Sequence, residues 1–451
     1  MLSWADRFDI FCFLDNHGYG MPGHAVECLL GAGANERLEA AAGNALAQLA
    51  DFSAGRKDWL FGHLGYGLAE ETEPSPAGTA AYSSRPGISS QAVPGTPPLT
   101  AADPIGFPDL FFFVPHIVIE LRPDSTDPGI APLSGSMRIG SFEKDQAVVF
   151  EQIGAMRVLP PAPSKTTAAI ALQSRFSREE YLGTVRRLQE HILRGDCYEI
   201  NFCQEFFACP VSIDPLQTWF SLSRSSPNPF AACYKLDKRY LLCASPERYL
   251  RRIGNTLLSQ PIKGTSPRAG GDAVDAGVAQ QDKAARDRLY ASAKDRSENV
   301  MVVDLVRNDL SKICLEGSVT VEELYGIYTF PQVHQMISSI KGELPAGAGL
   351  ADCIRATFPM GSMTGAPKNR VVELIARVER TRRGIFSGAV GYMDPKGDFD
   401  FNVVIRSILY NGNDGYLSYQ VGSGITFYSD PEQEYEECLW KAEGIKKALG
   451  L

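Results

Sequence analysis

The stretch that decides the fold class is GDCYEINFCQEF, at residues 195–206. From Tyr198 to Glu205, apolar and polar side chains alternate with a period of two, which predicts a β-strand. Ser177 and Glu180 have the spacing of a capping box, so a helix is expected to begin at Ser177 and to run up to this strand. The middle of the chain therefore combines a helix with a half-buried strand.

Strand-like and helix-like segments are unevenly distributed over the rest of the chain. Because the strands cluster and the helices stand apart from them, the pattern favours an α+β fold over regular βαβ winding. Strands are expected at 8–14, 59–64, 110–121, 147–150, 231–234, 240–244, 249–253, 388–393, 399–410 and 416–422, and helices at 35–49, 280–305, 349–356, 366–379 and 431–449.

The chain has 451 residues, more than an ordinary single domain, so two regions are expected. A Pro-rich stretch, LPPAPSK, begins a linker at 159–174 between an N-terminal segment, 1–158, and a C-terminal region, 175–451. Within the N-terminal segment, residues 70–109 are rich in Pro, Gly, Ser, Thr and Ala. Such a composition predicts a long loop.

Composition places the chain among soluble globular proteins, with 44% apolar and 22% charged residues. The net charge of -9 argues against a nucleic-acid or anionic-membrane partner, since both require a basic surface. No apolar run reaches the roughly 18 residues of a membrane-spanning helix, and the first residues lack a secretory signal. The ten cysteines have no zinc-site spacing and are expected to be reduced thiols in the cytoplasm.

Two predicted helices carry pairs of acidic residues. Glu298 lies on the apolar face of helix 280–305 with Asp295 about one turn before it, and Glu434 and Glu437 lie three residues apart on the last helix. Carboxylates near a buried face favour a hard cation such as Mg²⁺. The alternatives are an arginine partner for Glu298 and a surface salt bridge between Glu437 and Lys441.

Three Gly-rich turns lie between and beside these helices: PIKGTSPR (261–268), FPMGSMTGAPKNR (358–370) and VGSGITFYSD (421–430). The first two turns can present backbone N–H groups to an anion, although tight turns with solvated lysines would have the same composition. The third resembles, by itself, a strand that runs into a glycine turn. The second turn departs from the spacing of a phosphate-binding loop, so an ATPase is excluded.

Taken in order, these segments resemble the chorismate-binding family of anthranilate synthase, isochorismate synthase and aminodeoxychorismate synthase component I (para-aminobenzoate synthase component I). The motifs that carry the resemblance are GDCYEINFCQEF, SPERYL, PIKGT, KDRSENVMVVDLVRNDL, FPMGSMTGAPK, GAVGYMD, FNVVIRS, GSGI and EYEE, with FLDNHGYG and WLFGHLGYGL in the N-terminal segment. The resemblance implies an anthranilate synthase component I-like fold, with large antiparallel sheets packed as a sandwich, helices outside and the active site in the cleft between the layers.

Lys263 decides which member of the family the chain resembles. Anthranilate synthases have a small residue at the centre of P-I-x-G-T, whereas aminodeoxychorismate synthases have lysine, as here. The resemblance implies that Lys263 adds to C2 of chorismate while the C4 hydroxyl leaves, and that ammonia from a separate glutamine amidotransferase subunit then adds at C4. The product would be 4-amino-4-deoxychorismate, on the way to 4-aminobenzoate and folate.

The same resemblance assigns roles to further residues. Glu247 corresponds to the general acid, and Glu298 and Glu437 to the Mg²⁺ ligands, with Asp295 and Glu434 as their companions. The substrate-binding residues implied by the correspondence are Arg406, Ser362, Gly422, Ser423, Gly424, Lys441 and Thr265.

Some positions depart from the family pattern and leave other readings open. Isochorismate synthases have a lysine base where this chain has Glu199, and the family's frequent histidine aligns with Gln335, one residue away from His334. The alternatives are therefore anthranilate synthase component I, an isochorismate or salicylate synthase, and a non-enzymatic chorismate-binding protein. Lys263 and Glu199 argue against the other synthases, and the intact acids and Arg406 argue against a protein without activity.

Overall fold

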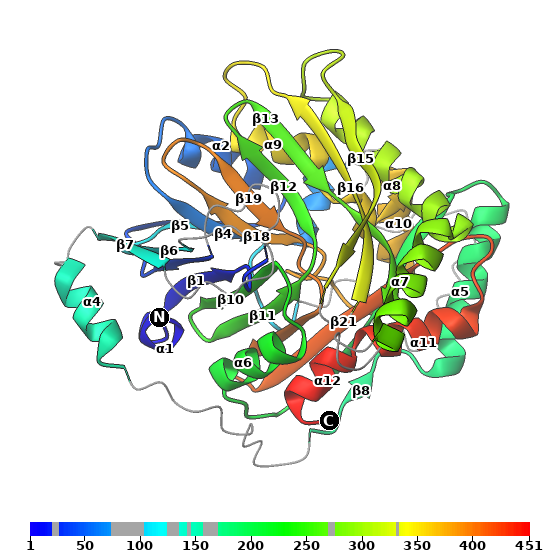
Figure 1. Ribbon diagram of the computed structural model, residues 1–451, viewed down its shortest axis with the longest axis horizontal. Helices are drawn as coiled ribbons and strands as arrows, with labels where there is room; N and C mark the ends of the chain where they lie inside the picture. Colours follow the sequence, from blue (N-terminus) through cyan, green and yellow to red (C-terminus); the bar gives the residue numbers. More distant parts are fainter. Residues whose placement is uncertain are drawn as a thin grey trace.

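Two large β-sheets form the centre of the molecule (Figure 1). The computed structural model describes residues 1–19, 27–73, 103–123, 135–141, 146–156, 170–268, 276–330 and 333–451. Within these ranges the first sheet has 11 strands and the second has 10. The pairings between the described strands are all antiparallel. The expected α+β class with large antiparallel sheets is thus confirmed.

Strands from both ends of the chain lie next to one another in each sheet. In spatial order, the first sheet contains β17 (Gly365–Ala366), β9 (Glu199–Ala208), β21 (Tyr416–Ile425), β20 (Ser407–Asn411), β11 (Arg239–Ser245), β10 (Phe230–Leu236), β1 (Ile10–Asp15), β2 (Cys28–Ala32), β6 (Ile117–Pro123) and β7 (Gly135–Ser141), with β8 (Gln173–Ser174) paired to β9. The second contains β14 (Ile262–Pro267), β16 (Val333–Glu343), β13 (Thr256–Gln260), β12 (Arg248–Ile253), β19 (Phe399–Asn402), β18 (Ala389–Met393), β4 (Leu60–Leu64), β5 (Leu110–Val114) and β3 (Glu36–Ala40), with β15 (Thr320–Thr329) paired to β16.

The helices pack on the outside of the sheets (Figure 1). Helices α5 (Arg178–Leu193), α6 (Pro215–Ser225) and α11 (Pro431–Lys441) contact the first sheet, and α12 (Glu443–Leu449) packs on α6. Helices α7 (Ala276–Ala291) and α8 (Ala293–Ser311) contact the second sheet. The remaining helices are α1 (Leu2–Ala5), α2 (Ala45–Ser53), α3 (Ala69–Thr72), α4 (Gln146–Gly154), α9 (Leu350–Thr357) and α10 (Lys368–Val378), with short 3₁₀ turns η1 (Tyr66–Leu68) and η2 (Gly361–Met363).

Strand β1 shows why the first sheet is buried on both faces. Its side chains alternate, so Ile10 and Cys12 belong to the core shared with the second sheet, whereas Phe11 and Phe13 belong to the core beneath the outer helices. Apolar residues at successive positions of one strand thus reflect burial on both sides. The interior between the sheets is the layer into which the functional side chains project.

Several local expectations are confirmed and several are wrong. The capping box of Ser177 and Glu180 begins α5, and Asp430 with Pro431 begins α11. The segment 399–410 is not one strand, because the chain leaves the second sheet after β19 and enters the first at β20. Helix 280–305 is interrupted at Ser292, which caps α8, and residues 147–150 belong to helix α4.

The N-terminal segment contributes strands to both sheets. Strands β1, β2, β6 and β7 extend the first sheet, and β3, β4 and β5 extend the second, each beside strands from the C-terminal region. The expected loop at 70–109 and the expected linker at 159–174 lie mostly outside the described residues. The N-terminal segment, 1–158, and the C-terminal region, 175–451, contribute strands to the same two sheets and residues to the same hydrophobic cores.

Candidate active site

A cavity of about 550 Å³ opens between the two sheets and the helices α8 and α11. Nearly all of the predicted site residues line it: Glu247, Lys263, Thr265, Asp295, Glu298, Ser362, Arg406, Gly422, Gly424, Glu434, Glu437 and Lys441. Ser423 does not, because its side chain points to the other face of β21, next to the Tyr181 hydroxyl. Residues more than 200 positions apart in the sequence therefore meet in one polar cavity.

Lys263 reaches this cavity from β14. Its Nζ lies 2.5 Å from Oε1 of Glu199, which projects from β9 of the other sheet. Burial by itself would lower the pKa of Lys263, but attraction to Glu199, Glu298 and Glu247 raises it overall. The resting side chain is an ammonium, so it must lose a proton before its nitrogen can act as a nucleophile.

The approach of Lys263 to Glu199 depends on Gly424 of β21. A Cβ atom at this position would lie 2.4 Å from Oε1 of Glu199 and 2.8 Å from Nζ of Lys263. Neither distance is compatible with ordinary van der Waals contact, so a side chain here would displace the ion pair. The glycine of GSGI thus makes room for a contact between two sheets.

Glu247 lies in the connection between β11 and β12 and is 4% exposed. Burial raises its pKa from 4.5 to about 7, although the neighbouring Ser362, Lys263 and Arg406 favour the ionised form. A carboxyl group with this pKa is still protonated in about half of the molecules at pH 7, whereas an ordinary glutamate is almost fully ionised there. It can therefore donate that proton to a departing oxygen.

Arg406 faces the cavity from the segment between β19 and β20. Its backbone has φ 51°, an uncommon conformation for a residue with a side chain, and the strained turn carries the chain from one sheet to the other. Burial lowers the pKa of Arg406 to about 10, and Glu247 opposes this change. Its guanidinium forms no hydrogen bond or ion pair with a described residue, which leaves it available to an anionic ligand.

The acidic residues of α8 and α11 meet on the other side of the cavity. Lys294 bridges the two helices, with Nζ 3.9 Å from Glu298 Oε1 and 4.0 Å from Glu434 Oε1. Burial raises the pKa of Glu298 to about 7. Burial acts in the same direction on Glu437, but Lys441, at 2.7 Å, and more distant lysines lower its pKa overall.

These acids fit a hard cation by their chemistry. Burial raises the pKa of Glu298 more than the neighbouring Lys263 and Lys294 lower it, and a cation bound beside this carboxylate would stabilise its ionised form. Glu437 does form the expected salt bridge with Lys441, whose Nζ also donates to the Gly422 carbonyl at 2.9 Å. In the described part of the chain, the carboxylates of this site do not form a three-residue group with ligand atoms within 4.8 Å. Mg²⁺ often retains several waters, so such a spacing is compatible with binding.

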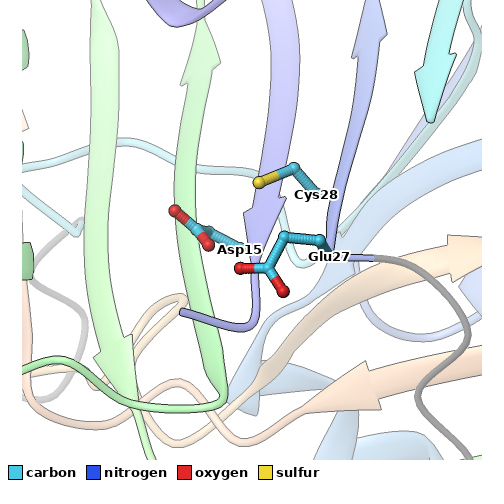
Figure 2. Close-up of side chains that lie close together, drawn as sticks. All are labelled: Asp15, Glu27 and Cys28. Atoms are coloured by element: carbon cyan, nitrogen blue, oxygen red, sulfur yellow. The ribbon is translucent and has the colours of Figure 1, made fainter. Parts of the chain in front are cut away.

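A tighter acidic group lies elsewhere, at the ends of β1 and β2 (Figure 2). The ligand atoms of Asp15, Glu27 and Cys28 lie within 4.8 Å of one another. The backbone amide of Gly18 donates to Glu27 at 2.7 Å, so this carboxylate is already partly satisfied. Burial and the two acids raise the pKa of Cys28, which keeps the thiol protonated and a poor metal ligand.

Three positions at which the chain departs from the family pattern have different surroundings. His334 points away from the cavity, where its ring contacts Asp282 at 3.1 Å and Thr329 at 3.0 Å, as expected for a packed histidine. Gln335, the next residue of β16, lines the cavity. Glu199 is buried against Lys263, a contact that the sequence did not reveal because the two residues lie on different sheets.

Asn201 and Lys294 are among the cavity residues that the sequence does not single out. Asn201 lines the cavity two residues after Glu199, and the period of two along β9 would have placed both on one face. Lys294 precedes Asp295 in KDRSEN and was not separated from ordinary surface lysines. Its position between two carboxylates became visible only from the packing of α8 and α11.

Several named proteins are similar in sequence to part of this chain. The aminodeoxychorismate synthase component 1 of Escherichia coli (strain K12) is 38% identical over 277 residues, which are 61% of this chain and 59% of that protein. The aminodeoxychorismate synthase of Streptomyces pristinaespiralis is 40% identical over 289 residues, which are 64% of this chain and 39% of that protein. The matched part thus spans less than two thirds of these relatives.

Solved structures share the fold at low sequence identity. Anthranilate synthase component I from Streptococcus pneumoniae superposes with a TM-score of 0.71 at 22% identity, covering 93% of this chain and 91% of that one. The menaquinone-specific isochorismate synthase from Escherichia coli gives 0.70 at 17% identity, covering 99% and 91%. These likenesses confirm the expected anthranilate synthase component I-like fold.

The sequence model of one protein family, described as chorismate binding enzyme, matches residues 25–447. This range includes the whole cavity lining and almost the entire chain of 451 residues. The chain therefore belongs to the chorismate-binding enzyme family.

Proposed function

We propose that this protein converts chorismate and ammonia into 4-amino-4-deoxychorismate. The observation that carries the proposal is the position of Lys263, whose amino group lies in the same cavity as the buried, proton-holding Glu247. A nucleophile and a general acid are the two groups that displacement of a hydroxyl requires. Relatives at 33–40% identity carry the name aminodeoxychorismate synthase, which supports the same reaction.

In the first step the Lys263 amine forms a bond to C2 of chorismate. The two ring double bonds shift, the C4–O bond breaks, and Glu247 donates its proton so that the hydroxyl leaves as water. Before this step Lys263 must lose one proton, and Glu199 at 2.5 Å is placed to accept it. The raised pKa of Glu247 and its burial suit the role of acid.

In the second step ammonia forms a bond to C4 and the double bonds shift back. The C2–N bond breaks and Lys263 leaves as a neutral amine, which recovers its proton from Glu199. The new ammonium group at C4 returns a proton to Glu247. Atoms and charges balance, because chorismate and ammonia have become the 4-amino product and water.

Binding of the dianionic substrate needs local positive charge in an acidic protein. Arg406 and Lys441 face the cavity, and Thr265, Ser362, Gly422 and Gly424 line the same space. Glu298 and Glu437, with Asp295 and Glu434 nearby, would hold Mg²⁺. When bound, this ion supplies positive charge for the C1 carboxylate of chorismate.

The ammonia would come from a second protein that hydrolyses glutamine. The relatives named component 1 support such a division of labour.

No described helix is long and apolar enough to cross a membrane. All ten cysteines are free thiols, which supports an assignment to the cytoplasm.

The test is to incubate the pure protein with chorismate, MgCl₂ and ammonium chloride, and to identify the product by mass spectrometry. The expected product is 4-amino-4-deoxychorismate, and Lys263→Ala should lose it. A matched control is Lys283→Ala on α7, whose lysine is not part of the cavity lining. Anthranilate, isochorismate or salicylate as the sole product, or full amination by Lys263→Ala, would refute the proposal.

A further inference from the structure

Lys294 is a cavity residue that the proposed mechanism does not use. It lies in the first turn of α8, after the cap at Ser292. Its Nζ lies 3.9 Å from Oε1 of Glu298 on the same helix and 4.0 Å from Oε1 of Glu434 on α11. Among the described residues, it is the only lysine or arginine whose side-chain nitrogen comes within 4.0 Å of either carboxylate. An ammonium group thus stands between two acids of the expected Mg²⁺ site.

The lysine and the two acids differ in their exposure to water. The side chains of Glu298 and Glu434 are 16% and 4% exposed, whereas that of Lys294 is 59% exposed. Carboxylates in such surroundings repel one another unless a positive charge offsets them, and Lys294 supplies this charge from the solvent. Because an ion pair with an exposed member is weak, the lysine can also leave at little cost.

The two distances are longer than those of a direct ion pair. A charged N–H···O hydrogen bond spans about 2.7–2.9 Å, so Lys294 is not locked to either carboxylate. Mg²⁺ usually keeps several waters. With an Mg–O distance of about 2.1 Å and a hydrogen bond of about 2.7 Å, a carboxylate that binds through one water lies about 4 Å from the ion. The Lys294 ammonium therefore occupies space that a hydrated cation would need.

The charge of Lys294 also acts on the third carboxylate, Glu437. Burial raises the pKa of Glu437, but Lys441 and, less strongly, Lys294 lower it overall. Lys441 is held in place, because its Nζ also donates to the Gly422 carbonyl at 2.9 Å. Lys294 has no such anchor among the described residues. A divalent cation beside these acids would be repelled by the Lys294 ammonium, so each cation disfavours the other.

We propose that Lys294 and Mg²⁺ exchange at this site, with the lysine in place of the ion whenever no metal is bound. The inference rests on the proposed Mg²⁺-dependent amination and assigns Lys294 as a positioning residue for the metal ligands. Without metal, its ammonium offsets the repulsion between Glu298 and Glu434. When Mg²⁺ binds, the head group of Lys294 moves into water. Lys294 therefore keeps the ligands together and weakens Mg²⁺ binding.

The test measures Mg²⁺ binding to metal-stripped protein by isothermal titration calorimetry, without chorismate. Lys294→Met keeps a long, flexible side chain without the charge, and its Kd for Mg²⁺ should be about ten-fold lower than that of the wild type. Lys294→Arg keeps the charge and should bind Mg²⁺ as the wild type does. In EDTA, Lys294→Met should unfold at a lower temperature than the wild type, and MgCl₂ should raise its unfolding temperature by more.

A matched control is Lys283→Met, which makes the same change of net charge at an exposed lysine of α7 outside the cavity lining. Its Kd for Mg²⁺ should equal that of the wild type. An unchanged or higher Kd in Lys294→Met would overturn the exchange, and so would an equal fall in Lys283→Met. An unchanged Kd together with a raised KM for chorismate would instead make Lys294 a substrate ligand.

Failure of the exchange can be distinguished from failure of the proposed function. Wild-type protein that binds no Mg²⁺ would refute the metal site and the exchange together. Wild-type protein that binds Mg²⁺ but forms no 4-amino product would refute the proposed function. The comparison of Mg²⁺ binding between Lys294→Met and the wild type would then still stand, because it is made without chorismate.

Discussion

Replacing Glu247 by glutamine should stabilise the protein above neutral pH while it removes activity. The substitution keeps the size of the side chain and removes its ability to ionise. Burial raises the pKa of this carboxyl from 4.5 to about 7, so the folded protein holds the proton more tightly than the unfolded chain. Between pH 4.5 and about pH 7 the carboxyl is ionised in the unfolded chain but still largely protonated in the folded protein. The free energy of unfolding of the wild type therefore falls as the pH rises through this range.

The size of the effect follows from the two pKa values. The difference between 4.5 and about 7 corresponds to about 3.4 kcal/mol at pH 8.5, at about 1.4 kcal/mol for each pKa unit. At pH 5.5 only about 1.4 kcal/mol of this penalty has developed. Glu247→Gln has no such penalty, so its advantage over the wild type should grow by about 2 kcal/mol between pH 5.5 and 8.5.

Urea unfolding at several pH values from 5.5 to 8.5 measures this difference directly. Glu190→Gln on α5 is a matched control, because Glu190 is exposed and its removal changes no buried charge. The amination rate of Glu247→Gln should fall by about 10²-fold or more, as expected for the loss of a general acid. Parallel stability curves for wild type and Glu247→Gln would show that this carboxyl is not held protonated by burial.

Three further substitutions test other parts of the structure. Gly424→Ala places a Cβ 2.8 Å from Nζ of Lys263 and should lower the amination rate by about 10²-fold. The control is Gly183→Ala on α5, where a Cβ has open space and the rate should not change. Equal rates in both variants would contradict the steric argument. Arg383→Met removes the partner of the buried Glu379 carboxylate, which lies 2.7 Å from the Arg383 guanidinium. The free energy of unfolding in urea should fall by about 3–5 kcal/mol. A loss below about 1 kcal/mol would argue against a buried ion pair between these residues. Glu298→Gln should raise the Mg²⁺ concentration for half-maximal activity by about ten-fold or more, and an unchanged Mg²⁺ titration would exclude it as a ligand.

Local sequence signals were reliable where the physical cause is itself local. The capping box at Ser177 satisfies backbone groups within one turn, so its residues predict the start of α5 correctly. Alternation along β9 likewise predicts the strand. The segment 399–410 has the β-branched and aromatic composition of one strand, but the chain changes sheets at Arg406.

The family resemblance predicted most of the cavity residues, but it could not predict their mutual contacts. Gly424 carries no side chain, so nothing in its own chemistry reveals that it admits the Lys263 ion pair. Ser423 was expected beside it in the substrate site, yet the pleat of β21 turns its side chain to the other face. Neighbouring positions in a motif therefore had different surroundings.

By itself, the sequence determined the α+β class, the positions of caps and strands, and the set of chemical groups, because these depend on the residue types and on spacings of a few positions. Tertiary structure alone decided the contact of Glu199 with Lys263, the crossing of Arg406 between the sheets and the raised pKa of Glu247. Burial and electrostatic attraction act through space, and they depend on which distant segments pack together. The sequence shows that position 263 is a lysine, but its carboxylate partner, Glu199, is 64 positions away and lies on the other sheet.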